Sequence, residues 1–329
     1  MDNTIWIEKY RPTDFSQIIG QDKNINMLNS MISNGSLPHL LFHGRSGVGK
    51  TSVITSISNK LYGKNKTFMV MRLDASDDRG INTVRDEIKG FADKMTPFNS
   101  GIKLIILDEA DSMTYDAQFA LRRIIEKYSD NTRFCLICNY ENKIIPAIKS
   151  RCINIRFNPI DKKVIVTRLI EICNIEMIKY DDDCITSIAN IANGDLRKAI
   201  NILQSISMMK KNISSELCYE TIGIPKPQLV EDVFNILINK KINYMDAFDY
   251  MKKNILDDGI LLSFLLQQLS NYMINKIIST KTKSNTLSKT MINYPSIIME
   301  LSRLESDVAI STFNDIYMAG LVSVFKKYC

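Results

Sequence analysis

A short glycine-rich stretch, residues 44–51 (GRSGVGKT), constrains the fold of this chain more than any other feature. It matches the pattern G-x-x-x-x-G-K-[ST], in which the backbone N–H groups of a loop surround phosphate oxygens. The pattern requires a strand before the loop and a helix after it. Apolar residues 40–42 provide the strand, and apolar positions between residues 53 and 61 share one helical face that Gly63 can end. The sequence therefore predicts an α/β domain with a phosphate-binding loop.

Every residue of this loop is a candidate for binding a nucleotide. The candidates are Gly44, Arg45, Ser46, Gly47, Val48, Gly49, Lys50, Thr51 and Ser52. The N-terminus of the following helix adds the positive end of its dipole, which favours anions. In this motif the lysine reaches the β- and γ-phosphates and the final hydroxyl binds Mg²⁺. We therefore expect Lys50 to contact phosphate and Thr51 to be a magnesium ligand.

Polar residues follow two further predicted strands. Asp108 and Glu109 come directly after the apolar residues 103–107. Asp108 is expected to bind Mg²⁺, and Glu109 to polarise the attacking water. Acidic residues after a strand also cap helices. The catalytic interpretation of Asp108 and Glu109 therefore depends on the phosphate loop upstream. Asn139 follows the strand at residues 133–138, where its amide can contact the γ-phosphate or simply form a turn.

Length and composition describe a soluble multidomain protein. A chain of 329 residues favours two or three domains, and 45% hydrophobic with 24% charged residues is typical of globular proteins. No apolar run is long enough to span a membrane, and the N-terminus lacks a signal-peptide pattern, which predicts an intracellular protein with no membrane partner. The net charge of +6 is compatible with a nucleic-acid partner.

The distribution of histidines and cysteines argues against a zinc site. The two histidines have no acidic or cysteine companions at ligand spacing. Cys135 and Cys138 form a C-x-x-C, but three residues apart on a strand they point to opposite faces. We therefore expect both thiols to pack in the core.

Prolines divide the chain into three predicted domains. Pro159 marks the first boundary, and Pro225 and Pro227 mark the second. The predicted domains are 1–158 (α/β), 159–224 and 225–329, the last two reading as helical throughout. Helices are predicted at residues 164–173, at 184–192, from Gly194 to about Met209 with Asp195 as its cap, and around 259–278.

Two segments of the first domain keep more than one interpretation. The mixed aromatic and charged residues 6–12 can be an arm that packs on the core or a flap that folds over the nucleotide base. A second strand is predicted at residues 68–73, followed by a helix over 81–95 with a regular apolar stripe. Arg85 and Lys89 lie on another face of that helix, as an ordinary solvated pair or as a functional one.

Taken together, these motifs resemble the small subunits of the replication factor C clamp loader, within the AAA+ ATPases. The resemblance covers essentially the whole chain and rests on residues 6–12 (WIEKYRP), 19–21 (IGQ), 44–51, 74–76 (DAS), 79–81 (RGI), 108–111 (DEAD), 150–152 (SRC) and 194–197 (GDLR). One departure is Arg45–Ser46, where the family usually has two prolines; it removes no phosphate ligand.

The resemblance implies a RecA-like AAA+ domain, a three-helix lid and a helical collar that builds a pentameric ring. The implied activity is hydrolysis of ATP, with Mg²⁺, to open a ring-shaped sliding clamp and load it onto primer–template DNA in replication and repair. The residue roles that it implies are adenine binding near Ile18 and Ile19, a first sensor at Asn139, a lid sensor at Arg197, and DNA contacts at Arg79, Arg85 and Lys89. Residues 95–98 are a candidate clamp contact or part of a satellite core.

Arg151 has an implied role in a neighbouring subunit. Its flanking residues, Ser150 and Cys152, are small, so it can project from the edge of the domain. An isolated surface arginine is usually solvated. In a ring of such subunits this edge would meet the next nucleotide, where Arg151 would act in trans as an arginine finger.

Two other functions remain as alternatives. One is a different AAA+ DNA remodeller, such as a branch-migration motor. The helical C-terminal third argues against it, because an all-helical domain there favours a collar. The other is a non-hydrolysing scaffold subunit, against which the intact Lys50, Thr51, Asp108 and Glu109 argue. The sequence names neither the partner subunits nor the organism. The expected location is the nucleus in a eukaryote, and otherwise the cytoplasm or a viral replication site.

Overall fold

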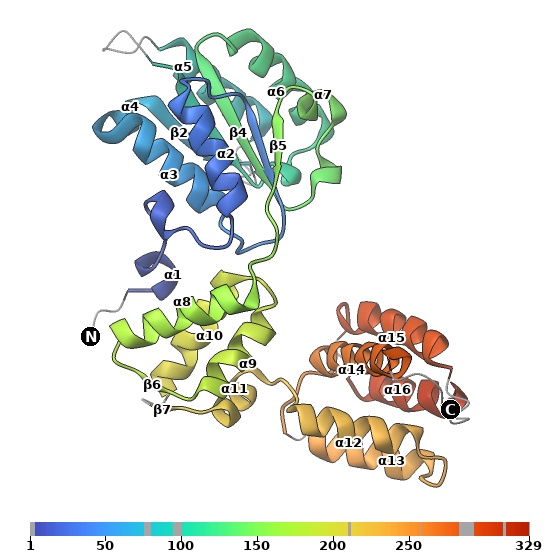
Figure 1. The fold of residues 1–329 in the computed structure, drawn as a ribbon. Helices are drawn as coiled ribbons and strands as arrows, with labels where there is room; N and C mark the ends of the chain where they lie inside the picture. The colour runs from blue at the N-terminus through green and yellow to red at the C-terminus, as the bar shows by residue number, and fades with distance from the viewer. Residues whose placement is uncertain are drawn as a thin grey trace. The chain divides into compact units, whose positions relative to one another are not determined.

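The computed structural model describes residues 4–75, 80–94, 101–209, 212–256, 258–282, 293–311 and 314–328. These residues form two compact units that divide between residues 213 and 214. The first unit contains a β-sheet with flanking helices and a smaller helical domain, and the second unit is built of helices (Figure 1).

Five parallel strands form the sheet of the first unit, in the order β2-β3-β4-β1-β5. The strands are β1 (Leu40–His43), β2 (Val70–Asp74), β3 (Lys103–Asp108), β4 (Thr132–Cys138) and β5 (Ile153–Arg156). β4 lies between β1 and β3, so the ends that lead into Gly44, Glu109 and Asn139 are adjacent. Ligands of parallel sheets bind at this carboxyl edge. The predicted α/β class is confirmed.

Helices cover both faces of this sheet (Figure 1). α2 (Asp22–Ser33) and α3 (Lys50–Tyr62) pack on one face, and α5 (Gly80–Asp93), α6 (Tyr115–Tyr128) and α7 (Pro146–Lys149) pack on the other. The shorter segments are α1 (Trp6–Lys9), η1 (Phe15–Gln17), η2 (Gly63–Asn65), α4 (Lys66–Met69), η3 (Ala110–Ser112) and η4 (Glu141–Lys143). Cys135 and Cys138 are buried on opposite faces, as predicted.

The residues at the ends of helices and strands predict some element boundaries correctly and others not. Thr114 caps α6, because its hydroxyl accepts a hydrogen bond from the N–H of Ala117 at 3.3 Å. The second strand, however, does not begin at Phe68. That residue lies in α4 with 63% of its surface exposed, and β2 begins at Val70. An uninterrupted apolar run shows no periodicity, so it does not distinguish a helical turn from a strand.

A smaller helical domain completes the first unit. It contains α8 (Lys162–Ile175), α9 (Asp182–Ala192) and α10 (Leu196–Met209). Asp195 caps α10, as predicted, since its Oδ1 accepts a hydrogen bond from the N–H of Lys198 at 3.0 Å. The structure adds one feature to this helical domain, a parallel pair between β6 (Lys179–Tyr180) and β7 (Asn212–Ile213). Strands of two residues are too short to show a sequence period.

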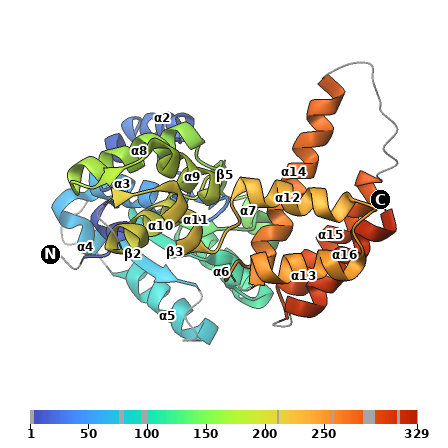
Figure 2. The same ribbon diagram turned by 90° about the horizontal axis from the view of Figure 1, so that it is seen from below.

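The second unit is a bundle with its own core (Figure 2). Its elements are α11 (Ser215–Ile222), α12 (Pro227–Ile238), α13 (Tyr244–Met251), η5 (Lys252–Leu256), α14 (Leu262–Thr282), α15 (Tyr294–Val308) and α16 (Asn314–Tyr328). The long helix predicted from Gly259 begins at Leu262, because Gly259 has a φ of +72° and lies in a turn. In the described parts of the chain, no helix has both the length and the apolar character needed to cross a bilayer.

Candidate nucleotide site

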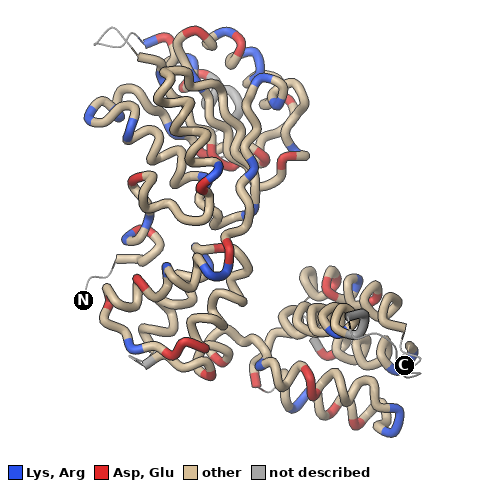
Figure 3. The backbone as a smooth tube through the Cα atoms, viewed as in Figure 1, with Lys and Arg blue, Asp and Glu red and all other residues tan. Residues whose placement is uncertain are grey.

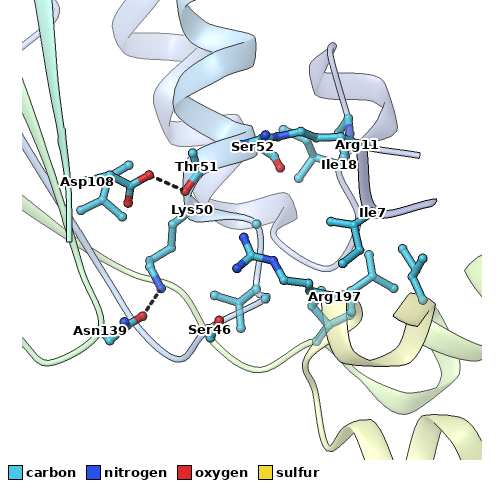
Figure 4. Close-up of a pocket in the computed structure, with 18 of the residues that line it drawn as sticks. Ile7, Arg11, Ile18, Ser46, Lys50, Thr51, Ser52, Asp108, Asn139 and Arg197 are labelled. Carbon is cyan, nitrogen blue, oxygen red and sulfur yellow. Dashed lines mark hydrogen bonds between the residues drawn. The ribbon is translucent and has the colours of Figure 1, made fainter. Parts of the chain in front are cut away.

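A cleft of the first unit lies at the carboxyl edge of the sheet, between the α/β domain, the N-terminal segment and the helical domain (Figure 4). It brings together most of the residues that the sequence predicts for nucleotide binding: Ile18, Ile19, Ser46, Gly47, Val48, Gly49, Lys50, Thr51, Ser52, Asp108, Glu109, Asn139 and Arg197. Gly44 and Arg45 do not line the cleft, although their carbonyls contact Lys50.

The Lys50 ammonium group is held inside the phosphate loop. It donates hydrogen bonds to the carbonyls of Gly44 at 2.7 Å and Arg45 at 2.8 Å, and to Oδ1 of Asn139 at 3.0 Å (Figure 4). These bonds engage all three of its N–H donors. Burial lowers the pKa of Lys50. A desolvated ammonium needs strong acceptors, so this position favours the binding of anionic phosphate oxygens.

Asp108 and Thr51 place two hard oxygen donors side by side. The Thr51 hydroxyl donates to Oδ2 of Asp108 at 3.2 Å, and Arg72 Nη2 contacts the same oxygen at 2.9 Å. Among the described residues, no group of three acidic, cysteine or histidine side chains could hold a metal. A hydroxyl and one carboxylate fit Mg²⁺, which is usually bound by one or two carboxylates together with substrate phosphates.

Two acidic residues after Asp108 have different environments. Glu109 is exposed, lines the cleft and has a φ of +52°, an uncommon value for a residue with a side chain. Asp111 instead points to the neighbouring strand end, where Oδ2 accepts hydrogen bonds from the N–H groups of Asn139 at 3.2 Å and Tyr140 at 3.1 Å. Asp111 thereby fixes the backbone from which the Asn139 side chain reaches Lys50.

The helical domain touches the phosphate loop at Gly47. The N–H of Leu196 donates to the Gly47 carbonyl at 3.2 Å, and a Cβ atom at Gly47 would lie 1.7 Å from Oδ1 of Asp195. Gly47 also has a φ of +68°, which favours glycine. The start of α10 is therefore seated directly on the loop. From the first turn of this helix, Arg197 extends into the cleft (Figure 4).

Apolar side chains line the cleft opposite the acidic residues. Figure 4 shows Ile7 and Ile18 across the cleft from Asp108 and Asn139. Pro12, Ile19, Ile160 and Ile200 also line the cleft. An apolar wall beside a phosphate loop suits the flat base of a nucleotide. The N-terminal segment therefore does more than pack on the core, since it forms part of the cleft.

Two further predicted residues, Arg151 and Lys89, lie away from this cleft. Arg151 contacts the Glu126 carboxylate and donates to the Ala147 carbonyl at 2.6 Å. Lys89 lies 3.8 Å from a carboxylate oxygen of Asp86 on the same helix. Arg79, the side chain of Arg85 and residues 95–98 lie outside the described residues. Figure 3 shows Lys and Arg interspersed with Asp and Glu along the described backbone of the first unit.

Arg72 is a cleft residue without a role in the sequence-based interpretation. It lies on β2 beside β3, and its guanidinium pairs with the carboxylate that is predicted to bind Mg²⁺. The available signal was a single charged residue within the otherwise apolar residues 68–73. Its partner became identifiable only from the strand order.

Sequence comparisons give the same family over both parts of the first unit. Residues 40–160 match the model of the AAA family, ATPases associated with various cellular activities, and residues 167–208 match the RCF1/5-like AAA+ ATPase lid domain. The chain is 41% identical to the probable replication factor C subunit 5 of Dictyostelium discoideum, over 98% of this chain and 90% of that protein. It is 35% identical to human replication factor C subunit 5, over 98% and 92% of the two chains.

Solved structures support the fold. The Holliday junction branch migration motor RuvB of Thermotoga maritima superimposes with a TM-score of 0.53, over 79% of this chain and 91% of RuvB. At 14% sequence identity, this likeness concerns the fold alone. The chain is 35% to 41% identical to these replication factor C subunits and only 14% identical to RuvB, which favours a clamp-loader subunit over a branch-migration motor. The chain belongs to the replication factor C subunits, the clamp-loader family of AAA+ ATPases.

Proposed function

We propose that this ATPase binds ATP with Mg²⁺ in the cleft and hydrolyses it as one subunit of a pentameric ring. The ring would open a ring-shaped sliding clamp and load it onto primer–template DNA, in replication and repair. The observation that carries the proposal is that Lys50, at the start of α3, meets Asp108 and Asn139 from the ends of β3 and β4 in one cleft, together with Arg197 from the helical domain. This combination provides groups for phosphate, metal and water at one edge of the sheet.

Each side chain has a proposed task in phosphoryl transfer. Lys50 and Arg197 neutralise charge on the phosphates, and Asn139 orients the water or the γ-phosphate. Thr51 and Asp108 would hold Mg²⁺, which neutralises charge on the β- and γ-phosphates when bound. Glu109 accepts a hydrogen bond from the attacking water and increases its nucleophilicity. All these groups are intact, which argues against the scaffold alternative.

The ATPase activity of the complex distinguishes the candidate functions. We expect hydrolysis by this chain with its partner subunits to rise when primed DNA and a sliding clamp are both present. Stimulation by four-way junction DNA, without a requirement for the clamp, would instead favour a branch-migration motor. A complex that assembles equally well but shows no turnover at this subunit would favour the scaffold alternative. Unprimed single-stranded DNA is the control for nonspecific stimulation.

We further propose that Arg79, Arg85 and Lys89 face the DNA backbone inside the ring. Phosphate contacts of this kind carry no sequence information, but they release counterions. Replacing Arg85 and Lys89 together by alanine should weaken primed-DNA binding equally across sequences. The slope of log affinity against log salt should flatten by about one per lost contact.

Titration of DNA binding against salt concentration tests this assignment. The control is Lys162→Ala with Lys163→Ala, which removes the same charge from the start of α8. An unchanged salt slope in the Arg85 and Lys89 double variant would return this pair to the solvated-face interpretation.

Further proposals concern assembly and location. We propose that Arg151 serves the neighbouring subunit's ATP, that residues 95–98 contact the clamp, and that the chain acts in the nucleus. The relatives from Dictyostelium, mouse and human support a eukaryotic replication factor. The proposed domain limits are 1–158, 159–224 and 225–329, and the matched lid model, residues 167–208, lies within the second.

A further inference from the structure

The N-terminal segment is anchored on two separate parts of the first unit. On the helical domain, the N–H of Trp6 donates to Oε1 of Gln204 on α10 at 3.1 Å. On the α/β domain, the Thr13 carbonyl accepts a hydrogen bond from Asn59 of α3 at 2.9 Å. Between these anchors, Arg11 and Pro12 line the cleft. The segment therefore bridges from the helical domain to the α/β domain along the cleft.

One carboxylate of the helical domain contacts two side chains of the N-terminal segment. Oε1 of Glu176 accepts hydrogen bonds from Lys9 Nζ at 2.7 Å and from the Tyr10 hydroxyl at 2.5 Å. Burial, then the hydrogen bond to Glu176, raises the pKa of Tyr10, so its hydroxyl remains a donor at neutral pH. Although burial alone would raise it, the bonds from Lys9 and Tyr10 lower the pKa of Glu176. Hydrogen bonds to a charged acceptor are about twice as strong as neutral ones.

The position of Glu176 on its own helix is unfavourable for a carboxylate. It is the C-cap residue of α8, where the helix dipole presents its negative end. The helix itself therefore gains nothing from this charge, and Glu176→Ala should leave α8 intact. The two contacts with the N-terminal segment give the carboxylate its favourable partners.

We propose that Glu176 is a positioning residue for adenine nucleotides, acting through the N-terminal segment. By fixing Lys9 and Tyr10 on the helical domain, it holds Arg11 and Pro12 at the cleft beside the base. The inference rests on the proposed function, since it takes ATP as the ligand. It predicts that loss of Glu176 affects binding of the base and leaves the phosphate loop unchanged.

The single tryptophan of the chain provides a direct readout, because Trp6 is buried next to this anchor. In the whole chain, Glu176→Ala should shift Trp6 emission to longer wavelength and speed ATP dissociation about 3- to 10-fold. Affinity for inorganic tripolyphosphate, which lacks the base, should not change. Tyr10→Phe, which removes only the hydroxyl, should give a smaller change in the same direction.

Glu171→Ala is the matched control, since Glu171 lies on α8 and pairs with Arg168 at 2.8 Å rather than with the N-terminal segment. Unchanged Trp6 emission or unchanged ATP dissociation in Glu176→Ala would overturn the proposal. Equal losses for ATP and tripolyphosphate would also overturn it, because they indicate a general structural effect. If the unsubstituted chain binds neither ligand, the proposed function itself fails.

Discussion

Lys50→Ala is expected to abolish ATP hydrolysis by this chain and to weaken ATP binding. The β- and γ-phosphates lose their cation, and the loop loses the group that joins the Gly44 and Arg45 carbonyls to Asn139. Removing one preorganised charge-stabilising group costs about 10²–10³ in turnover in other enzymes. Nucleotide titration and phosphate release, measured on the same preparation, give the two effects separately.

Glu109→Gln separates binding from chemistry at the same site. The amide keeps the shape of the side chain but loses the charge that polarises water, whereas Asp108 and Thr51 remain for the metal. We expect near-normal ATP binding with stalled hydrolysis. Asp116→Asn, an exposed carboxylate outside the cleft, is the control. Hydrolysis by Glu109→Gln at the unsubstituted rate would show that the catalytic assignment is wrong.

Arg151→Ala should leave ATP binding at this chain's own site intact and cripple hydrolysis at the neighbouring site. Within the chain, the Arg151 guanidinium pairs with Glu126 and donates to the Ala147 carbonyl, away from the cleft. It therefore has no part in the site of its own subunit. An arginine finger supplied in trans is worth about 10³–10⁵ in rate in other NTPases.

The measurement uses a mixed complex in which only this chain carries Arg151→Ala and hydrolysis at each site is followed separately. Arg303→Ala, which removes an exposed arginine paired with Glu300 in the second unit, controls for loss of charge. Loss confined to this chain's own site, or no loss at any site, contradicts the trans assignment.

The parts of the site that depend on strand ends were predictable from the sequence. The phosphate-loop pattern dictates β1, the loop and α3 together, because its chemistry requires that geometry. Apolar runs placed β3 and β4, and the carboxyl ends of parallel strands share one edge of the sheet. That rule alone brings Asp108 and Asn139 close to Lys50, where Asn139 now lies at 3.0 Å.

Contacts between distant polar side chains were not predictable. Lys103 begins an apolar strand, yet it is buried and its ammonium donates to the carbonyls of Phe91 at 2.8 Å and Ala92 at 3.2 Å, at the end of α5. Arg72 and Glu176 likewise find partners far away in the sequence. Periodicity reports which face of an element is buried, but it carries no information about which charged groups meet across elements.

Gly47 occupies a position that the phosphate-loop pattern leaves open to any residue. Asp195, which caps α10 and is distant in the sequence, lies so close to Gly47 that it leaves no room for a Cβ atom. Variation at this position is therefore constrained by Asp195 of the helical domain and by the positive φ of Gly47. A side chain at this position would push the start of α10 away from the loop and move Arg197 out of the cleft. Every residue that the phosphate-loop pattern specifies would still be present.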